Sequence, residues 1–305
     1  EFMGFKCGII GLPNVGKSTL FNALTETTSA ESANYPFCTI EPNVGNVIVP
    51  DNRLNLLASI AKSKNIIPTQ MQFVDIAGLV KGASKGEGLG NQFLSHIREV
   101  DAIIHVLRCF ENEKITHVNK IIDPIFDNEI IETELILADI NSLEKQMNNL
   151  QKKIRSDDKD LKKVYELMQK LIDWLSNGQK ISKINNLTLE EKLVLKSFHL
   201  LTSKPQLYVC NVDEKDVNNG NQLTQKVMNN DLTKDTKVIF ISSLIESEIC
   251  ALQEDEKKEF LNDLGLKQTG LSKLIHSGYE LLNLVTFFTV GPKETRAWTI
   301  KNGFT

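Results

Sequence analysis

This 305-residue chain lacks long hydrophobic runs, a cysteine framework and a strong excess of one charge. No apolar run approaches the roughly 18 to 20 residues that a membrane-spanning helix needs, and no signal-peptide pattern opens the sequence. The five cysteines are scattered and form no CxxC pair, which argues against a disulfide framework or a zinc site and fits a reducing cytosol. The net charge of −4 provides no global basic field for nucleic acid. We therefore expect a cytoplasmic globular protein without a membrane segment or DNA sequence specificity.

Short apolar runs alternate with helical patterns along the chain, which predicts an α/β fold with a mostly parallel sheet and helices on both faces. The length of 305 residues suits two domains, or one large domain with an insertion. We predict buried strands at residues 5–10, 69–75, 101–107, 206–210 and 237–241.

The apolar period changes to three and four residues between about 132 and 175, which predicts two long amphipathic helices. A polar break at residues 156–160 divides them, so we expect a helical hairpin inserted between strands of the sheet. Two short strands at 281–289 and 296–300 follow, and since such a pair is not stable alone, we expect the beginning of a β-rich domain that is incomplete at Thr305. The boundaries we predict are 3–131 with 200–281 for the α/β domain, 132–199 for the helical coiled-coil insertion and 282–305 for the β-rich domain.

The strongest functional signal is Gly11-Leu-Pro-Asn-Val-Gly16-Lys17-Ser18, which satisfies the GxxxxGK[ST] pattern of a phosphate-binding P-loop. It lies between a predicted strand and a predicted helix, which is the context that the motif requires. Glycines let the backbone wrap a phosphate, while successive N–H groups and the helix N-terminus supply positive potential. Lys17 is expected to reach the β- and γ-phosphates, and Ser18 to bind Mg²⁺. The phosphate-binding residues we predict are Asn14, Val15, Gly16, Lys17, Ser18 and Thr19.

The carboxylate partner of this loop is Asp75, which ends the second predicted strand in Phe73-Val-Asp75-Ile-Ala-Gly78. Asp75 is expected to hold Mg²⁺ through water, and the Gly78 N–H to sense the γ-phosphate. Thr39, in the loop between the two motifs, is the natural candidate for a second Mg²⁺ hydroxyl, with an ordinary loop threonine as the alternative. If the order of that loop depends on γ-phosphate and Mg²⁺, it is a switch.

The glycine-rich stretch at 82–90 follows Gly78 and predicts a second switch loop, with a linker as the alternative. Leu79 lies where Ras-type proteins place the glutamine that orients water, and leucine neither donates nor accepts a hydrogen bond. The water-orienting group must come from elsewhere, or hydrolysis must be slow. His117 is a candidate, because imidazole both donates and accepts at neutral pH; a surface histidine without a role is an equal alternative. His105, inside an apolar strand, is expected to be a core residue.

Asn211-Val212-Asp213-Glu214 follows the fourth predicted strand, where guanine-specific P-loop proteins have Asn-Lys-x-Asp. Valine replaces lysine, and glutamate, one methylene longer, replaces aspartate. Discrimination by hydrogen bonds to a base edge is lost when the partner is displaced, so adenine becomes the better match. Ser242-Ser243-Leu244 matches the loop that closes over the base, although Ser-Ser is also ordinary turn chemistry. The base-binding residues we predict are Asn211, Val212, Glu214, Ser242, Ser243 and Leu244.

Four stretches resemble the YchF, or Obg-like ATPase, family: residues 11–18, Pro36-Phe-Cys-Thr39-Ile-Glu-Pro-Asn43, residues 75–91 and Arg108-Cys-Phe-Glu-Asn112. Asn211 and Glu214 meet the family's Asn-x-x-Glu variant of the base motif, and residues 282–300 resemble the opening of its C-terminal TGS domain. The resemblance implies a P-loop domain of the translation-factor-related class, a coiled-coil insertion and a TGS domain. It also implies ATP hydrolysis in preference to GTP, Mg²⁺ dependence and association with ribosomes or RNA.

Two further features of the sequence fit more than one role. Asn14 is a candidate ligand for a monovalent cation such as K⁺ beside the phosphates, or an asparagine that stabilises the loop. Residues 141–165 carry seven basic and four acidic side chains, which is typical of a solvated helix face but also suits an RNA backbone. We predict a monomeric Mg²⁺-dependent ATPase and nucleotide switch that associates with the ribosome or ribosomal RNA. The alternatives are a GTPase with relaxed base specificity and a ribosome-binding module whose turnover is incidental.

Overall fold

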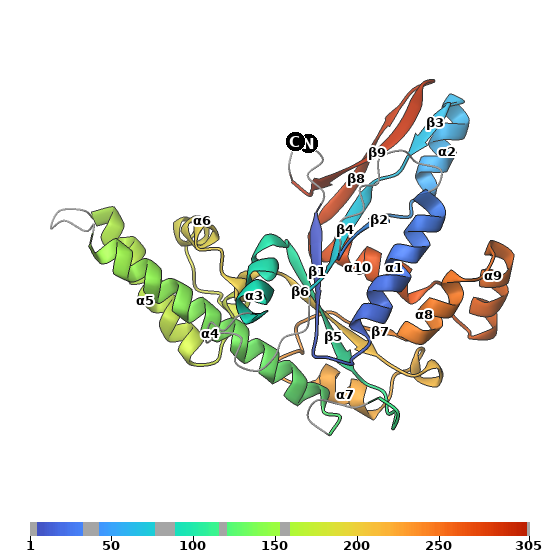
Figure 1. Cartoon of the computed structure of the whole chain (residues 1–305). Coiled ribbons are helices and arrows are strands. Elements are labelled where there is room, and N and C mark those ends of the chain that lie inside the picture. Colours follow the sequence, from blue (N-terminus) through green and yellow to red (C-terminus); the bar gives the residue numbers. More distant parts are fainter. Residues whose placement is uncertain (1–4, 33–42, 77–88, 116–120, 153–158, 304–305) are drawn as a thin grey trace. The chain divides into compact units, whose positions relative to one another are not determined.

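The computed structural model describes residues 5–32, 43–76, 89–115, 121–152 and 159–303 (Figure 1). The chain divides into two compact units, which we describe separately. Unit 1 comprises Glu1–Gly78, Val100–Ile125 and Gln206–Thr305, and unit 2 comprises Leu79–Glu99 and Phe126–Pro205. In the part that the structure describes, no helix is long and apolar enough to cross a membrane.

Unit 1 is built on a six-stranded sheet in the order β2-β4-β1-β5-β6-β7, in which only β2 runs antiparallel to its neighbour. β5 is buried at every position, as expected for a parallel strand covered on both faces. The five predicted strands are confirmed, whereas β2 was missed, because its five residues include Gly45 and Asn46, which are poor strand formers. The strands are β1 (Lys6–Ile10), β2 (Val44–Ile48), β4 (Gln70–Asp75), β5 (Ala102–Arg108), β6 (Gln206–Asn211) and β7 (Val238–Ile241).

Helices cover both faces of this sheet. On one face α10 approaches closely at Gly278, where a Cβ atom would lie 3.3 Å from the Met71 sulfur and 3.6 Å from the Cys7 sulfur. Burial raises the pKa of the Cys7 thiol to about 12, so this group packs and does not ionise. On the other face Val227 of α7 belongs to the same buried hydrophobic cluster as Leu107 of β5 and Tyr208 of β6. The helices of unit 1 are α1 (Lys17–Ser32), α2 (Asn52–Ala61), α7 (Gln222–Asn229), α8 (Ser243–Cys250), α9 (Glu254–Asp263) and α10 (Gly270–Leu281).

A second, three-stranded sheet in unit 1 has the order β3-β9-β8. The predicted tail strands are confirmed as the antiparallel hairpin of β8 (Leu284–Val290) and β9 (Glu294–Lys301), and β3 (Asn65–Ile67) adds a parallel strand from far earlier in the chain. This third strand supplies the support that a lone hairpin lacks. Residues 282–303 are part of unit 1, and the predicted boundary of a β-rich domain at 282 stays a prediction.

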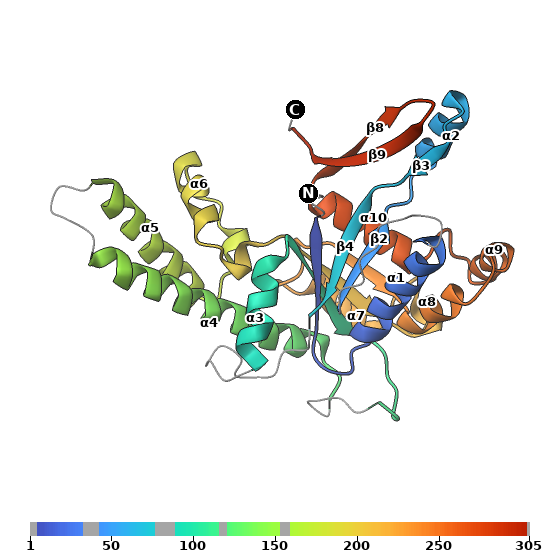
Figure 2. The same cartoon turned by 45° about the horizontal axis from the view of Figure 1, so that its top comes forward.

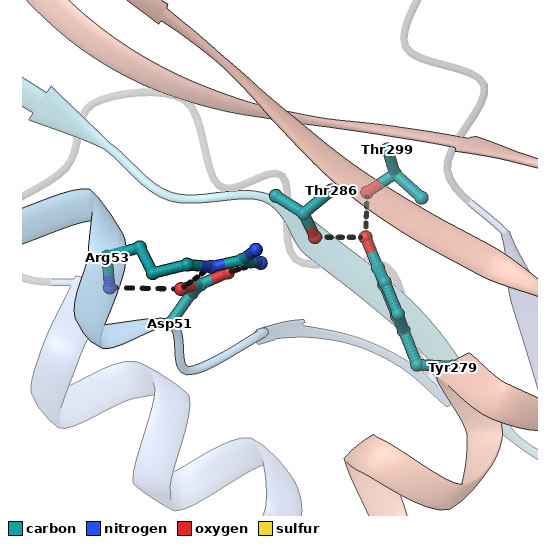
Figure 3. Close-up of polar contacts among 5 residues, drawn as sticks. All are labelled: Asp51, Arg53, Tyr279, Thr286 and Thr299. Carbon is teal, nitrogen blue, oxygen red and sulfur yellow. Dashed lines mark hydrogen bonds and ion pairs between the residues drawn. The ribbon is translucent and has the colours of Figure 1, made fainter. Parts of the chain in front are cut away.

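Polar contacts join this second sheet to the helices of unit 1 (Figure 3). The Tyr279 hydroxyl of α10 lies 2.9 Å from the Thr286 hydroxyl of β8 and 2.7 Å from the Thr299 hydroxyl of β9. At the start of α2, the Asp51 carboxylate accepts from the Arg53 backbone N–H and guanidinium, and this guanidinium lies 5.1 Å from the centre of the Phe288 ring of β8. The sheet is therefore anchored by hydrogen bonds as well as by backbone pairing.

Unit 2 is helical, and α4 and α5 lie side by side as the predicted hairpin (Figure 2). Its core contains Leu143, Met147, Leu167 and Leu171, in accord with the predicted period. α4 begins eight residues earlier than predicted, because Pro124 suits the first helical turn and the Asp123 carboxylate accepts from the Ile125 N–H at 3.1 Å. The elements are α3 (Leu89–Glu99), α4 (Pro124–Gln151, which starts in unit 1), α5 (Lys159–Ser176), η2 (Ile181–Lys183), α6 (Leu189–Ser197) and η3 (Leu201–Ser203).

Asp139 organises the polar interior of unit 2. Its buried carboxylate accepts hydrogen bonds from the Leu201 N–H, the Thr202 N–H and the Thr202 hydroxyl, each at 2.8 Å. Burial raises the pKa of Asp139, and these bonds oppose that shift. Nearby in the chain, the Lys204 ammonium donates to the Arg98 carbonyl at 3.1 Å and so attaches the end of α3 to the same segment. The segment after α6 is thus fixed to both α3 and α4.

Candidate nucleotide-binding site

The P-loop connects β1 to α1 and requires both of its motif glycines. A Cβ atom on Gly11 would lie 2.7 Å from the Val106 carbonyl oxygen, so this residue must pass close to β5. Gly16 has a φ of +93°, and a Cβ atom there would lie 2.1 Å from the Asn211 side-chain nitrogen. Backbone conformation and close approach therefore exclude a side chain at Gly16.

The loop encloses a hollow of about 370 Å³ at the N-terminus of α1. Of the predicted phosphate-binding residues, five line this hollow, and Val15 does not, because its side chain is buried in the core. Asn14 has a φ of +63°, a left-handed conformation that asparagine tolerates, which accounts for an asparagine in this loop without a cation. The lining residues are Leu12, Pro13, Asn14, Gly16, Lys17, Ser18 and Thr19.

Asp75 brings the two chemical groups of the P-loop together. It ends β4 beside Ile9 of β1, so its carboxylate reaches the start of α1. One carboxylate oxygen contacts the Lys17 ammonium, and the other lies 3.4 Å from the Ser18 hydroxyl. A hydroxyl and a carboxylate are oxygen ligands of the kind that Mg²⁺ binds, with water and phosphate oxygens completing its octahedron. The residues present therefore fit a Mg²⁺–phosphate group.

At the other end of the site, Asn211 holds two loops against each other. It is the last residue of β6 and only 5% exposed. Its side-chain N–H donates to the Val15 carbonyl at 2.9 Å, and its side-chain oxygen accepts from the Ser243 N–H at 3.0 Å. Both ends of this amide are thus engaged within the protein, and they fix the P-loop to the start of α8.

The remaining predicted base-binding residues fall into two groups. Val212 and Ser242 are buried: the Val212 N–H donates to the Ile241 carbonyl at 2.9 Å, and Ser242 is the N-cap of α8. Glu214, at the start of the 3₁₀ helix η4 (Glu214–Asp216), and Leu244 in the first turn of α8 are exposed. The buried group shapes the loops, and the exposed group faces solvent at their ends.

The comparisons with known proteins agree with this arrangement. A protein-family model described as "50S ribosome-binding GTPase" matches residues 6–211. The "Ribosome-binding ATPase YchF" of Haemophilus influenzae is 53% identical over 303 residues, which are 99% of this chain and 83% of that protein. The protein of the same name from Bacillus subtilis is 50% identical, over 99% of this chain and 82% of its own length.

The chain belongs to the YchF family. A solved structure named "Structure of the Schizosaccharomyces pombe YchF GTPase" superposes with a TM-score of 0.86 at 38% identity, covering 99% of this chain and 82% of that one. The predicted family and the predicted P-loop α/β fold are therefore confirmed. The relatives' names differ between ATPase and GTPase, which directs attention to the base end of the site in this YchF-family chain.

Sequence reasoning gave no role to Arg108, which stands in one of the stretches that carried the resemblance to the YchF family. Its guanidinium is buried and donates to three carbonyl oxygens, those of Phe110 and Asn112 at 3.2 Å and that of Ile115 at 3.0 Å. The segment so fixed lies against the base loop, because the Cys109 N–H donates to the Asn211 carbonyl at 2.8 Å. A charged residue at the end of an otherwise apolar strand was the available signal.

Asn221 is a second residue that sequence reasoning missed. Its side-chain N–H groups donate to the Cys109 carbonyl at 2.8 Å and to the Asp216 carboxylate at 2.9 Å, while its oxygen caps α7. It thereby joins the segment after β5 to the loop after β6. No local pattern in the sequence distinguishes it from an ordinary helix N-cap.

Several predicted site residues lie outside the described residues: Thr39, Gly78, Leu79, the glycine-rich stretch at 82–88 and His117. Their roles stay predictions. His105 was predicted to be a core residue, and this is confirmed, since it is fully buried beside Tyr208 with ring centroids 5.5 Å apart.

Proposed function

We propose that this chain is a Mg²⁺-dependent ATPase that acts as a nucleotide switch on the ribosome. The observation that carries the proposal is the convergence of Lys17 and Ser18 on the Asp75 carboxylate at the ends of two adjacent strands. The relatives named ribosome-binding ATPases support the substrate and the partner. Ribosome association would place the protein in the cytoplasm, and we propose a monomer.

Lys17 would exchange its contact with Asp75 for the β- and γ-phosphate oxygens. Ser18 would then bind Mg²⁺ directly and Asp75 through water, with Thr39 as a further hydroxyl ligand and the Gly78 N–H on the γ-phosphate. The metal ion supplies neutralisation of the charge that develops on the phosphate oxygens. The backbone N–H groups from Asn14 to Thr19 would orient the phosphates, because the helix N-terminus favours negative charge.

The attacking water needs a group to orient it, because Leu79 provides none. We propose His117 for this role. Because Leu79 occupies the water-orienting position, intrinsic turnover should be slow, roughly 10⁻⁴ to 10⁻² per second, as for switch proteins without an assisting arginine. His117→Ala should lower the rate by about 10 to 100-fold with ATP affinity nearly unchanged, since the residue acts on water. Normal turnover of this variant would remove His117 from the mechanism.

The base end favours ATP over GTP. Recognition of guanine by hydrogen bonds needs a side chain that is held within bonding distance of the base edge. Here the Val212 side chain is buried and Glu214 stands exposed at the beginning of η4. A GTPase is the second candidate, because one relative is named a GTPase and the matching family is described as GTPase.

Hydrolysis and ribosome binding are tested together with the Lys17→Ala variant. We expect purified wild-type protein to release phosphate from ATP with Mg²⁺ and the variant to release almost none. Co-sedimentation with ribosomes should depend on ATP in the wild type and lose this dependence in the variant. Equal, nucleotide-independent sedimentation of both proteins would instead support a ribosome-binding module with incidental turnover. Absence of sedimentation in either protein would contradict the ribosomal role while leaving the ATPase intact.

A further inference from the structure

Residues of α5 and α6, with the N-cap Thr188, line a groove of about 790 Å³ in unit 2. Figure 2 shows the two helices. Its apolar lining includes Val164 and Leu167 of α5 and Val194 of α6. Leu167 belongs to the core of the unit, and the two valines pack against that core. The groove therefore has an apolar floor that is continuous with the interior of the helical unit.

The outer side of α6 carries apolar side chains that the fold leaves in solvent. Leu189 is 81% exposed and Leu193 is 67% exposed. They are four residues apart, so they form one ridge on the helix, and Leu193 also lines the groove. No residue of α6 is fully buried. This helix thus offers more apolar surface than its own packing uses.

Polar contacts join the two walls of the groove. Thr188 and Glu191 form a capping box at the start of α6. The Lys170 ammonium of α5 donates to the Asn186 carbonyl at 3.1 Å and to the Glu191 carboxylate at 3.2 Å. Hydrogen bonds from the Thr188 backbone N–H and from Lys170 lower the pKa of Glu191, so it stays ionised. A preformed groove binds with a smaller ordering cost than a flexible surface.

The charges around the groove are predominantly negative. Four acidic residues line it against two lysines, and one of these, Lys170, is already paired with Glu191. An anionic nucleic-acid backbone is repelled by such a lining, whereas a cationic segment is attracted. The lining acids are Asp160, Glu166, Glu190 and Glu191.

We propose that this groove is a docking site for a basic amphipathic helix of a partner protein. The α5 side extends from Asp160 to Lys170, which corresponds to roughly 15 Å or about three helical turns. A helix of that length would place apolar side chains at i, i+4 and i+7 on the floor and beside Leu193. Its lysines or arginines would face the acidic rim. The proposal goes beyond the ATPase function and does not depend on it.

The test uses a fluorescein-labelled synthetic helix of about 14 residues, made of leucine, alanine and lysine with the leucines on one face. A second peptide carries glutamate in place of every lysine. Fluorescence anisotropy with the full chain should show saturable one-to-one binding of the basic peptide and at least about tenfold weaker binding of the acidic one. Equal binding of the two peptides, or binding without saturation, would overturn the proposal.

Variants locate the binding. Leu193→Asp and Glu190→Lys should each weaken the basic peptide by about tenfold or more, since anchor residues dominate such interfaces. Leu56→Asp, on α2 of unit 1, is the matched control because Leu56 is also exposed, at 63%, and lies outside the groove. Far-ultraviolet circular dichroism should show all three folded, and Glu166→Lys, at an exposed acid that lines the groove, replaces any groove variant that is not. Three results would contradict the proposal. The first is an equal loss of peptide affinity in Leu56→Asp, and the second is displacement of the peptide by a single-stranded RNA oligonucleotide. The third is self-association of the chain, seen by sedimentation velocity, that displaces the peptide.

Discussion

The phosphate end and the base end of the proposed nucleotide site are built differently. At the phosphate end, Lys17 and Ser18 meet a single carboxylate, that of Asp75, at the ends of two adjacent strands. At the base end, Asn211 joins loops that are far apart in the sequence, and its amide is occupied by Val15 and Ser243. The phosphate end presents charged and polar groups to the nucleotide, whereas at the base end Asn211 mainly holds the P-loop and the start of α8 together.

This difference is consistent with a chain that keeps the GxxxxGK[ST] motif but has Asn-Val-Asp-Glu in place of the guanine-reading Asn-Lys-x-Asp pattern. The P-loop needs particular atoms at particular places, so the GxxxxGK[ST] pattern leaves little freedom. The base loop needs Asn211 for its position, while Val212 serves packing and Glu214 is exposed. Base preference can change there without disturbing the frame.

The largest effect is expected from Lys17→Met, which removes the only positive charge among the residues that line the P-loop hollow. ATP affinity should fall by about 100-fold or more and hydrolysis should become undetectable, because the ammonium group would stabilise the β- and γ-phosphates. Titration calorimetry and phosphate release check this. Lys162→Met, at an exposed position of α5, is the control and should behave as wild type. Unchanged ATP binding in Lys17→Met would contradict the role of Lys17 in binding the phosphates.

Gly16→Ala tests the contact between the two ends. The new Cβ atom would lie 2.1 Å from the Asn211 side-chain nitrogen at a φ of +93°, so both the loop and the Asn211 side chain must shift. We expect a loss of about 1–3 kcal/mol in the free energy of unfolding and at least about tenfold weaker ATP binding. Chemical denaturation and calorimetry measure the two effects.

Gly178→Ala is the matched control for backbone strain. Gly178 has a φ of +72°, but a Cβ atom there would meet nothing within 4 Å. This variant should lose about 1 kcal/mol or less and bind ATP normally. A similar ATP defect in both glycine variants would mean that the contact with Asn211 is unimportant.

Asn211→Ala removes both side-chain hydrogen bonds of Asn211 and leaves the P-loop sequence itself unchanged. The Ser243 N–H and the Val15 carbonyl would lose their partners, which costs about 1–3 kcal/mol for a buried unpaired group. ATP and GTP should weaken by a similar factor, because the variant disturbs the frame and not the selectivity. A change confined to one nucleotide would show that Asn211 reads the base directly.

The double variant Val212→Lys with Glu214→Asp should have a smaller effect on nucleotide binding, namely a change in selectivity. We expect the ratio of ATP to GTP affinity to move towards GTP, together with some loss of stability, because Lys replaces the buried Val212 side chain. Competition binding with the two nucleotides measures this ratio. If the ratio stays constant, the selectivity comes from other groups, including the backbone around Val212 and Leu244.

The smallest effect concerns Glu246 of α8, just after the base loop. Its buried carboxylate accepts from the Gly270 and Leu271 N–H groups, and burial raises its pKa above the ordinary 4.5. A raised pKa in the folded state means that the folded protein binds more protons than the unfolded chain. Its contribution to stability is thus fully present below the unfolded pKa and is lost as the pH rises through the folded pKa.

The pH dependence of unfolding measures this contribution against Glu246→Gln, which does not titrate. The free energy of unfolding of the wild type should increase relative to the variant as the pH falls from neutral towards 4.5. Parallel pH profiles for the two proteins would contradict the burial effect at this position.

Much of the fold and of the phosphate site was predictable from the sequence because the signals are local. The strand before Gly11, the motif itself and Asp75 at the end of β4 are each recognisable within a few residues. β2 and β3 were not predictable in the same way. β2 contains Gly45 and Asn46, β3 has only three residues, and both depend on partners elsewhere in the chain. The start of α4 at Pro124 precedes the apolar period that revealed the helix.

The base end was less predictable because its important contacts are long-range. Asn221 and Cys109 are 112 positions apart, and Asn211 and Val15 are 196 apart. A single sequence shows the residue types but not that these residues meet. Arg108 is similar, because its three bonds to backbone carbonyls depend on how the following loop folds back.

The most direct test of the account is the affinity of the wild-type chain for ATP and for GTP, measured by titration calorimetry in excess Mg²⁺. The account predicts tighter binding of ATP. The phosphate end contacts both nucleotides in the same way, whereas the base end has Val212 and Glu214 where guanine-specific P-loop proteins have lysine and aspartate. Equal or tighter binding of GTP would contradict it.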